Sequence, residues 1–359
     1  MYLKRSYFVV VALLLAALVL SACGDSTSTP APVATSTTAT STTSSATTVA
    51  GASSGKKLMV LWATKQEAVW GFQEEAIKKA AAADGVQITF KNADNNVANQ
   101  AADVDDAISQ KPDAVIFVAV DTSTAASLVR KLKDAKIPVV ADDRLPDASN
   151  VDIYVTADSH KVGMEQAKYL AQKSADKGNI LLLEGETGNS VAAAITQGNK
   201  DELKSHPGIK VLLDQAHDKW SREAAQATTT GALNKNGKDQ IQGILANNSG
   251  MAMGAVTAAK KAGVDLSKTC IIGSDADKDA VESIIAGELC ADVDKRPLDL
   301  GAGSYAAARA LMRGQTPDKD TVIKNGTFDI PVKYTPIQLI NKSNVGDMKY
   351  RYPEIKFPS

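Results

Sequence analysis

The stretch Val139-Val-Ala-Asp-Asp-Arg-Leu-Pro146 carries the pattern that decides the fold. Three apolar residues, typical of the end of a buried strand, run directly into Asp142, Asp143 and Arg144. A hydrophobic core does not tolerate unpaired carboxylates or an unpaired guanidinium, because burying a charge without a partner is costly. The strand must therefore end at a place where some polar group meets these side chains.

Ten short apolar runs, including the one that ends at Ala141, have the length and composition of β-strands. They cover residues 58–63, 86–90, 114–120, 137–141, 153–157, 180–183, 211–213, 241–246, 270–273 and 290–293. Helical patterns lie between most of them; from Ala125 to Leu132, for example, apolar residues recur at i, i+3, i+4 and i+7. This alternation predicts parallel sheets with helices on both faces. Two doubly wound lobes accommodate ten strands better than one sheet, although a β/α barrel has the same periodicity.

The composition agrees with a globular protein of two domains. The chain has 359 residues, of which 44% are hydrophobic, 40 are basic and 41 are acidic. At roughly 100 to 200 residues per domain, this length predicts two domains. The even charge balance gives no bias toward nucleic acid as a partner.

Residues 1–23 have the features of a lipoprotein signal peptide. Two basic residues precede an apolar run at 8–20, which is short for a bilayer span. The run ends in Leu20-Ser-Ala-Cys23, which resembles the lipobox of bacterial lipoproteins. The resemblance implies cleavage before Cys23 and diacylation of its sulfur, which would anchor the chain to a membrane. An ordinary signal peptide with a chance cysteine is the alternative.

Residues 24–56 have the composition of a flexible tether between this anchor and the folded body. Of the 32 residues from 24 to 55, 18 are Ser or Thr, and Asp25 is the one charged residue. Such a segment has too little apolar surface to form a core.

Polar residues follow nearly every predicted strand, at the edge where ligands of open parallel sheets bind. Those we single out are Asp121, Asp142, Asp143, Arg144, Asp158, Ser159, Glu184, Glu186, Asp214, Asp218, Trp220, Asn247, Asn248, Asp275, Asp277, Asp294, Lys295 and Arg296. Asp, Asn and Ser in these places also serve as helix caps, but capping does not explain Arg144 or Trp220. Acids, amides, cations and an indole together match the hydroxyls and the C–H face of a neutral sugar.

Seven motifs in order resemble the sugar-binding proteins of bacterial ABC importers, most closely the xylose-binding type. They are Val139-Val-Ala-Asp-Asp-Arg144, Asp152-Ile-Tyr-Val-Thr-Ala-Asp158, Lys161-Val-Gly163, Ala246-Asn-Asn248, Gly273-Ser-Asp-Ala-Asp277, Asn325-Gly-Thr327 and Tyr334-Thr-Pro336. The resemblance implies the α/β fold of type I periplasmic binding proteins: two doubly wound parallel-sheet lobes joined by three crossings of the chain. It further implies a monosaccharide bound as the lobes close, an ABC permease as partner, a monomer, and neither cofactor nor metal.

Placed on this sequence, the resemblance assigns residues 57–157 and 296–326 to the first lobe. Residues 158–295 and 327–359 then form the second lobe. The three crossings are expected near residues 157–159, 293–296 and 327–331.

The resemblance also implies a set of sugar-binding residues. They are Trp70, Asp143, Arg144, Asn189, Trp220, Asn248, Asp275, Lys295 and Arg296. The acids, the amides and Arg144 would bond the hydroxyls, and the two indoles would sandwich the ring. The hinge cation falls on Arg296, or on Lys295 if the register shifts by one residue.

The chain departs from the xylose-binding pattern at two places. Val69 stands where an arginine precedes the first tryptophan, and an asparagine pair is replaced in part by Ser190 and Val191. Losing a partner for a buried hydroxyl costs about 1 to 3 kcal/mol, so the sugar could be another pentose or hexose. Without the resemblance, Trp70 is equally well explained as a core residue of its helix.

Cys270 and Cys290 stand at the starts of two strands that are expected to be neighbours. In an oxidising compartment outside the cytoplasm, either a disulfide or two buried free thiols fits this placement.

Other functional classes have less support. A sugar-sensing repressor would need a DNA-binding motif at its amino end and a cytoplasmic address, which the export signal excludes. A secreted carbohydrate-active enzyme needs a paired acid and base, for which Glu184 and Glu186 are the candidates. The three histidines lie at no metal-ligand spacing. A lipid-anchored transport receptor, at the cell surface or in the periplasm, explains most; a chemosensory sugar receptor without transport is the other alternative.

Overall fold

The structure, a computed structural model, describes residues 55–358. The predicted signal peptide, the candidate lipidation residue Cys23 and the tether up to residue 54 lie outside this range. No helix within the described residues combines the length and the apolar character that a membrane span requires.

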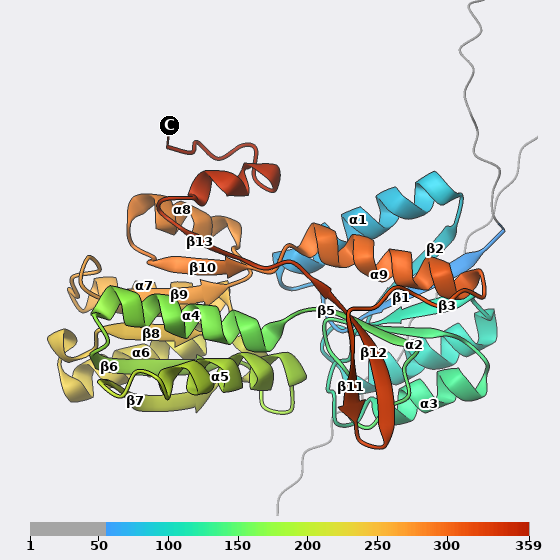
Figure 1. Ribbon diagram of the computed structural model, residues 1–359, viewed down its shortest axis with the longest axis horizontal. Helices are drawn as coiled ribbons and strands as arrows, with labels where there is room; N and C mark the ends of the chain where they lie inside the picture. The colour runs from blue at the N-terminus through green and yellow to red at the C-terminus, as the bar shows by residue number, and fades with distance from the viewer. Residues whose placement is uncertain (1–54, 359) are drawn as a thin grey trace, which may run out of the picture. The chain divides into compact units, whose positions relative to one another are not determined.

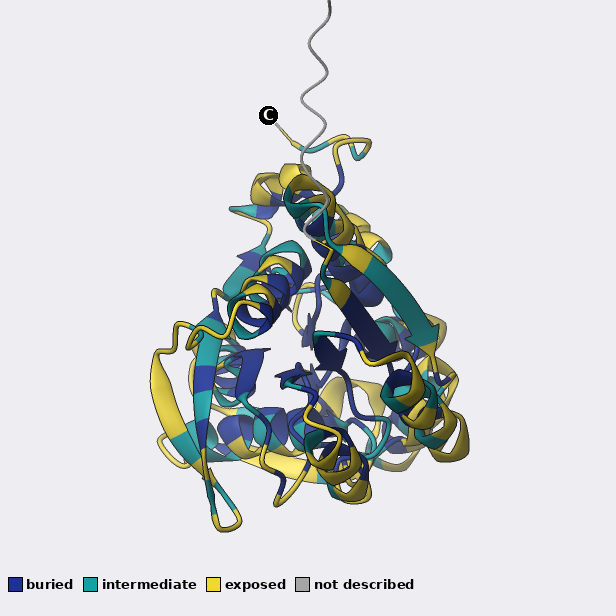
Figure 2. Ribbon diagram, turned by 90° about the vertical axis from the view of Figure 1, so that its right-hand side faces the viewer, coloured by how far each residue is buried: buried dark blue, intermediate teal, exposed yellow. Residues whose placement is uncertain are grey.

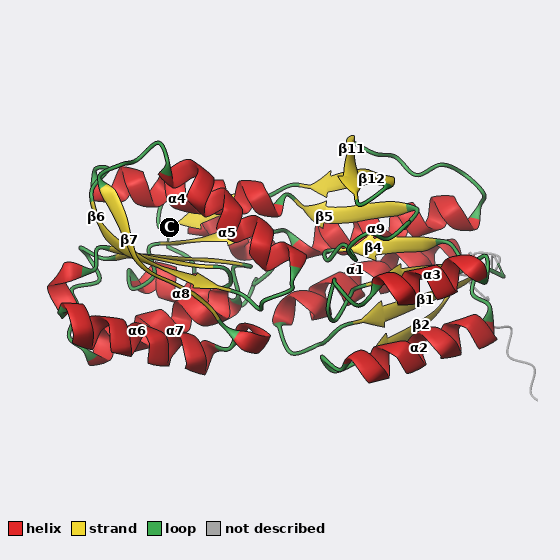
Figure 3. Cartoon of the chain, turned by 90° about the horizontal axis from the view of Figure 1, so that it is seen from below, coloured by secondary structure: helices red, strands yellow, loops and turns green. Residues whose placement is uncertain are grey.

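Within residues 55–358, the first sheet has seven strands in the order β11-β12-β5-β4-β3-β1-β2. Their bounds are β1 Lys57–Trp62, β2 Gln87–Asn92, β3 Ala114–Phe117, β4 Val139–Asp142, β5 Ile153–Ala157, β11 Thr321–Asn325 and β12 Phe328–Thr335. All neighbours are parallel except β11 and β12, which form an antiparallel pair. Among the described residues, four helices cover this sheet (Figure 3): α1 Ala68–Asp84, α2 Val97–Gln110, α3 Ala126–Asp134 and α9 Pro297–Met312.

The side chains of β1 explain why both faces of this sheet are covered. Leu58, Val60 and Trp62 pack in one cluster with residues of α1 and α9. Met59 and Leu61 pack in another with residues of α2 and α3. Since alternate residues of a strand point to opposite faces, a continuously apolar strand requires helices on each side. The two helical layers lie on opposite sides of the sheet in Figure 1.

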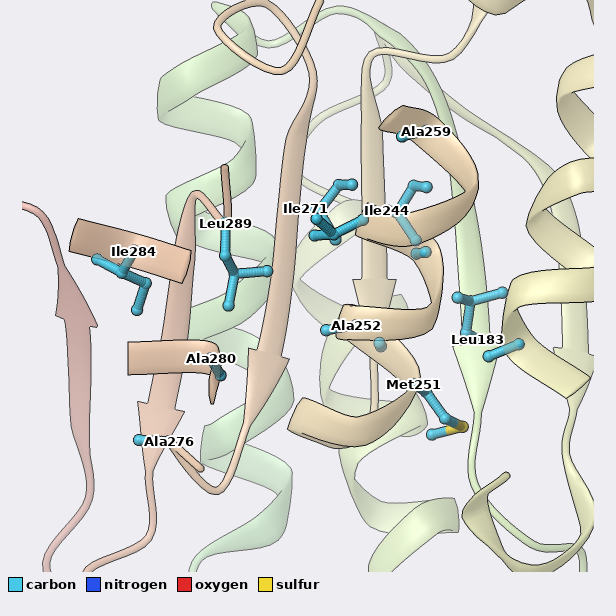
Figure 4. Close-up of a cluster of buried hydrophobic side chains, with 14 of the residues drawn as sticks. Leu183, Ile244, Met251, Ala252, Ala259, Ile271, Ala276, Ala280, Ile284 and Leu289 are labelled. Atoms are coloured by element: carbon cyan, nitrogen blue, oxygen red, sulfur yellow. The ribbon is translucent and has the colours of Figure 1, made fainter. Parts of the chain in front are cut away.

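The second sheet, in the part of the chain that the structure describes, has six strands in the order β13-β10-β9-β8-β6-β7. Their bounds are β6 Gly178–Glu184, β7 Ile209–Ala216, β8 Gly243–Ala246, β9 Cys270–Ser274, β10 Ala291–Asp294 and β13 Gln338–Asn341. Its helices are α4 Ser159–Ser174, α5 Ser190–Leu203, α6 Arg222–Asn236, α7 Ser249–Lys261 and α8 Lys278–Ala286, with short 3₁₀ turns η1 Asp218–Trp220, η2 Lys238–Gln240 and η3 Val345–Tyr350. Figure 4 shows apolar side chains of α7 and α8 packed against Ile244 and Ile271 of the sheet. In Figure 2 the buried strands lie in the interior, and the exposed residues lie on the outer faces of the helices.

Short polar side chains begin several of these helices. Asn96, Asp158, Asn189, Ser221 and Asn248 each accept a hydrogen bond from a backbone N–H of the first turn that follows. Such caps satisfy donors that the helix itself leaves unpaired. The capping explanation for polar residues after strands therefore applies to several of the residues singled out from the sequence.

The two open sheets confirm the predicted fold class and exclude the β/α barrel. All ten predicted strands are present as β1 to β10, whereas β11, β12 and β13 were not predicted. Both sheets belong to one compact unit, Ala50–Ser359.

The third crossing differs from the expected one. Residues 327–331 do not connect the lobes, because β12 pairs with β5 of the first sheet, Val332 with Tyr154 and Thr335 with Ala157. Gly326, at φ 63°, instead lies in a tight turn between the paired residues Asn325 and Phe328. The chain passes to the second sheet only after Thr335, and Gln338 begins β13 there.

Candidate functional site

One cavity is lined by residues from both sheets and from the starts of α1 and α9. The lining residues are Glu67, Val69, Trp70, Gln73, Asp143, Arg144, Val191, Trp220, Asn248, Asp275, Lys295, Pro297 and Leu300. The space within it, counting open solvent at its mouth, is about 500 Å³. Apolar rings and convergent polar groups together are typical of small-molecule sites.

Asp143 and Arg144 reach the cavity because β4 ends immediately before them. Asp143 has a φ of 58°, and its backbone N–H still donates to the carbonyl of Val155, 2.9 Å away. Arg144 donates to the carbonyl of Ala119 at 3.1 Å, and its guanidinium lies 5.4 Å from the centre of the Trp70 ring. The first sheet thus offers a carboxylate and a held cation beside an indole.

Trp70 is both a core residue and a lining residue of the cavity. Its ring packs against Trp62 with 5.7 Å between the centroids, which is a core contact. Its Nε1–H donates to a carboxylate oxygen of Glu67 at 2.7 Å, and both residues line the cavity. The hydrogen bond fixes the orientation of the indole from one side.

Trp220 is held in a strained backbone conformation. Lys219 and Trp220 have φ values of 54° and 55°, a region that bulky side chains rarely adopt. Such conformations persist where the surroundings enforce them, and they cluster at ligand-binding sites. The indole lies against Gly185, since a Cβ on that glycine would come within 2.6 Å of the ring. Its buried Nε1 has no hydrogen-bond partner among the described residues.

Asn248 and Asp275 come from the ends of β8 and β9. The Oδ1 of Asn248 accepts from the backbone of Met251 at 2.8 Å as a helix cap, so the same residue caps α7 and lines the cavity. Asp275 has a φ of 100° and pairs with Lys295, whose Nζ lies 2.8 Å from its Oδ1.

The electrostatics of this pair follow from burial and from the facing charges. Burial raises the pKa of Asp275, and the Asp143 carboxylate acts in the same direction, whereas Lys295 lowers it. Burial alone would lower the pKa of Lys295, but Asp275 and Asp143 outweigh that effect and raise it, so Lys295 keeps its charge. The cavity wall therefore presents a fixed ammonium between two acidic side chains.

Two of the nine implied sugar-binding residues do not line the cavity. Asn189 caps α5, with Oδ1 accepting from the backbone of Val191 at 3.0 Å. Arg296 pairs with Asp299 and lies over the ring of Tyr350 at 5.0 Å, while its neighbour Lys295 lines the cavity instead. The alternative register with Lys295 is the one that the structure places at the cavity.

Several lining residues were not singled out from the sequence. Glu67 and Gln73 lie at the start of α1, and Pro297 and Leu300 lie at the start of α9. A signal for Glu67 was its spacing of three residues before Trp70, which brings the two side chains together at the start of a helix. The carboxyl pair considered for an enzyme, Glu184 and Glu186, does not line the cavity.

The two cysteines of the second lobe form a disulfide. Cys270 and Cys290 are joined with a Cα–Cα distance of 5.1 Å, at the starts of β9 and β10. This is the edge of the sheet opposite to the cavity, so the bond belongs to the framework and not to the candidate site.

Comparisons with known proteins agree with this geometry. A D-xylose-binding periplasmic protein of Escherichia coli is 31% identical over 77% of this chain and 84% of that protein. The fructose import binding protein FruE of Bifidobacterium longum is 30% identical over 78% of this chain and 87% of that protein. A solute-binding protein of an ABC transporter from Bacillus halodurans, solved with bound myo-inositol, superimposes with a TM-score of 0.74 at 26% identity, covering 84% of this chain and all of that one.

The family model described as periplasmic binding protein domain matches residues 58–316, which include nearly all of β1, the strands β2 to β10 and all the residues that line the cavity. The chain therefore belongs to the periplasmic binding protein family, with the type I fold and sugar-binding proteins of ABC importers among its relatives.

Proposed function

We propose that this protein binds a neutral monosaccharide or a related cyclic polyol outside the cytoplasm and delivers it to an ABC permease. The observation that supports this most is the cavity, where two indoles and a set of hydrogen-bonding groups come from both sheets. Relatives named for xylose, fructose and ribose support the ligand class. Import binding proteins among these relatives favour transport over a purely chemosensory role.

The lining residues act in three groups. Trp70 and Trp220 offer flat apolar faces to the C–H faces of the ring. Asp143, Asp275 and the Glu67 carboxylate accept hydrogen bonds from hydroxyls, while Arg144, Lys295 and the Asn248 amide donate them. Asn189 and Arg296 then contribute indirectly, as a helix cap and through an ion pair beside the second crossing.

Ligand binding works by differential contact. Arg144 belongs to the first lobe and Asn248 to the second, so a ligand that touches both stabilises the closed arrangement over the open one. The permease would then recognise the closed protein. The chain acts as a monomeric receptor and performs no chemistry on the sugar.

The xylose-binding type is the finer assignment, and the site departs from it at Val69 and Val191. Both residues line the cavity and offer no hydrogen bond from their side chains. A sugar with fewer or differently placed hydroxyls at these two positions would fit better.

Titration calorimetry against D-xylose, D-ribose, D-fructose and myo-inositol tests the ligand class. We expect saturable heat and quenched tryptophan fluorescence with at least one of them, and an unchanged sugar by NMR after prolonged incubation. No saturable binding to any panel member would contradict the proposal, and a new product signal would favour the carbohydrate-active enzyme.

A lipid on Cys23 anchors the protein in the outer leaflet of the cell membrane, with residues 24–56 as a tether. The lipobox-like Leu20-Ser-Ala-Cys23 supports this assignment. Detergent phase partitioning of expressed protein tests it: the wild type should enter the detergent phase and Cys23→Ala should remain in the aqueous phase. Equal partitioning of the two would favour an ordinary signal peptide.

A further inference from the structure

The segment after β13 belongs to the second lobe and contains a buried arginine, Arg351. Val345, Met348 and Tyr352 pack in the core of that lobe. Arg351, next to Tyr352 in the chain, has a side-chain exposure of 0%. A guanidinium with no access to water needs charged and polar groups around it, although Nε and Nη2 of Arg351 make no hydrogen bond among the described residues.

The partners of Arg351 link it to the second crossing and to the candidate site. One nitrogen lies 3.2 Å from Oδ1 of Asp294 and donates to the backbone carbonyl of Asp275 at 2.5 Å. A second nitrogen lies 3.6 Å from Oδ1 of Asp277. Asp294 also accepts from the hydroxyl of Tyr350 at 2.7 Å. Arg351 therefore braces the strained backbone of Asp275, which lines the cavity.

A ring from the first lobe covers the same guanidinium. Phe72 lies on α1, two residues after Trp70, and packs against the core of the second lobe. Its centroid lies 4.6 Å from the guanidinium carbon of Arg351. The Phe72 ring also meets the Tyr352 ring edge to face, at 5.7 Å. The same turn of α1 thus places Trp70 in the cavity lining and Phe72 against the second lobe.

We propose that Phe72 and Arg351 form an interlobe latch, a contact between the two lobes that is made on closure. In this proposal Arg351 is also a positioning residue for Asp275, whose carboxylate binds the sugar. This inference rests on the proposed sugar-binding function and identifies residues outside the cavity that set affinity. Only contacts that differ between the open and closed states shift the equilibrium between them. The Phe72–Arg351 contact is of that kind, because its two members come from different lobes.

The first test removes the ring from the first lobe. Phe72→Ala is expected to weaken binding of the panel sugar that the wild type binds by about tenfold, as for a desolvated cation–aromatic pair. The loss should appear as a faster dissociation rate in stopped-flow tryptophan fluorescence. Phe72→Tyr keeps the ring and is expected to retain wild-type dissociation. We expect the melting temperature of the sugar-free protein to change little, since a latch made on closure does not contribute to an open state.

Phe90→Ala is the matched control. Phe90 is also a partly buried ring with a cation over it, the ammonium of Lys78 at 5.1 Å, but both residues lie inside the first lobe. We expect this variant to lower the melting temperature and to leave the dissociation rate at the wild-type value.

Arg351→Lys tests the positioning role, because it keeps the charge and loses the planar fork. Weaker binding and faster dissociation are expected, with a folded protein by circular dichroism. If the wild type binds a sugar and Phe72→Ala and Arg351→Lys dissociate from it at the wild-type rate, the latch is wrong and the proposed function stands. If the wild type binds no panel sugar, the proposed function fails and the latch fails with it.

Discussion

The ammonium nitrogen of Lys295 lies 2.8 Å from a carboxylate oxygen of Asp275, and both side chains are nearly buried, with exposures of 12% and 7%. Lys295 follows β10 at the second crossing and Asp275 follows β9, so the ion pair joins the hinge to the wall of the cavity. The ion pair holds the Lys295 ammonium in place before a ligand arrives. A ligand that hydrogen-bonds to this ammonium therefore does not have to order the lysine side chain.

Lys295→Met should destabilise the protein and weaken ligand binding. Removing one member leaves the other charge buried without a partner, which costs about 3 to 5 kcal/mol. Chemical denaturation measures the loss in the free energy of unfolding. Arg296→Met is the matched control, because its partner Asp299 is exposed and should lose about 1 kcal/mol or less. Equal losses in the two variants would contradict the assignment of the buried hinge cation to Lys295.

Gly185→Ala should displace the indole of Trp220. A Cβ there would lie 2.6 Å from the ring, closer than unbonded atoms approach. We expect weaker sugar binding and less ligand-induced quenching of tryptophan fluorescence. Gly231→Ala, in α6, is the control: its Cβ would meet nothing within 4 Å, and alanine in a helix should stabilise by roughly 0.5 to 1 kcal/mol. Unchanged affinity in Gly185→Ala would remove Trp220 from the site.

Asp277 should make the free energy of unfolding depend on pH near neutrality, a range in which most carboxylates do not titrate. Burial raises its pKa to about 7, with the Asp275 carboxylate acting in the same direction. The folded protein therefore holds a proton that the unfolded chain releases near pH 4, and the free energy of unfolding from this group falls as the pH rises from about 4 through 7.

Urea unfolding at pH 5 and pH 8 measures this effect. Asp277→Asn, which does not titrate, should lose less stability over that interval than the wild type. Asp279→Asn, at an exposed carboxylate that pairs with Arg222, should keep the wild-type slope. A wild-type slope in Asp277→Asn would show that Asp277 is ionised in the folded protein at both values.

Replacing Cys270 and Cys290 by serine should lower stability without changing sugar affinity. The bond spans 20 residues, for which loop closure predicts about 3 kcal/mol. The disulfide lies at the opposite edge of the sheet from the cavity, and neither cysteine lines the cavity. Thermal unfolding and calorimetry of the double variant separate the two effects. A large change in affinity would indicate that the disulfide shapes the cavity through the sheet.

Local patterns carried much of the fold and of the site. The ten apolar runs that form β1 to β10 could be recognised in the sequence because buried parallel strands are continuously apolar. Asp143, Arg144, Asn248 and Asp275 converge because the carboxyl ends of parallel strands share one edge. This rule needs only the position of each residue after its strand, which the sequence contains.

The strand β12 was assigned to the wrong lobe, whereas its hairpin partner β11 was assigned to the first lobe, where it lies. β12 mixes buried and partly exposed residues, β11 has no buried residue, and nothing local specifies which sheet the two strands join. The pairing of β12 with β5 is a long-range choice.

The sequence by itself determined that this chain forms two doubly wound lobes and which strand ends carry polar groups, because periodicity and strand order are local properties of the chain. Only the tertiary structure decided that Lys295 and not Arg296 faces the cavity, that Cys270 and Cys290 are bonded, and that Phe72 meets Arg351. These depend on the direction of each side chain and on contacts between residues far apart in the chain, and packing sets both only when the whole body has formed.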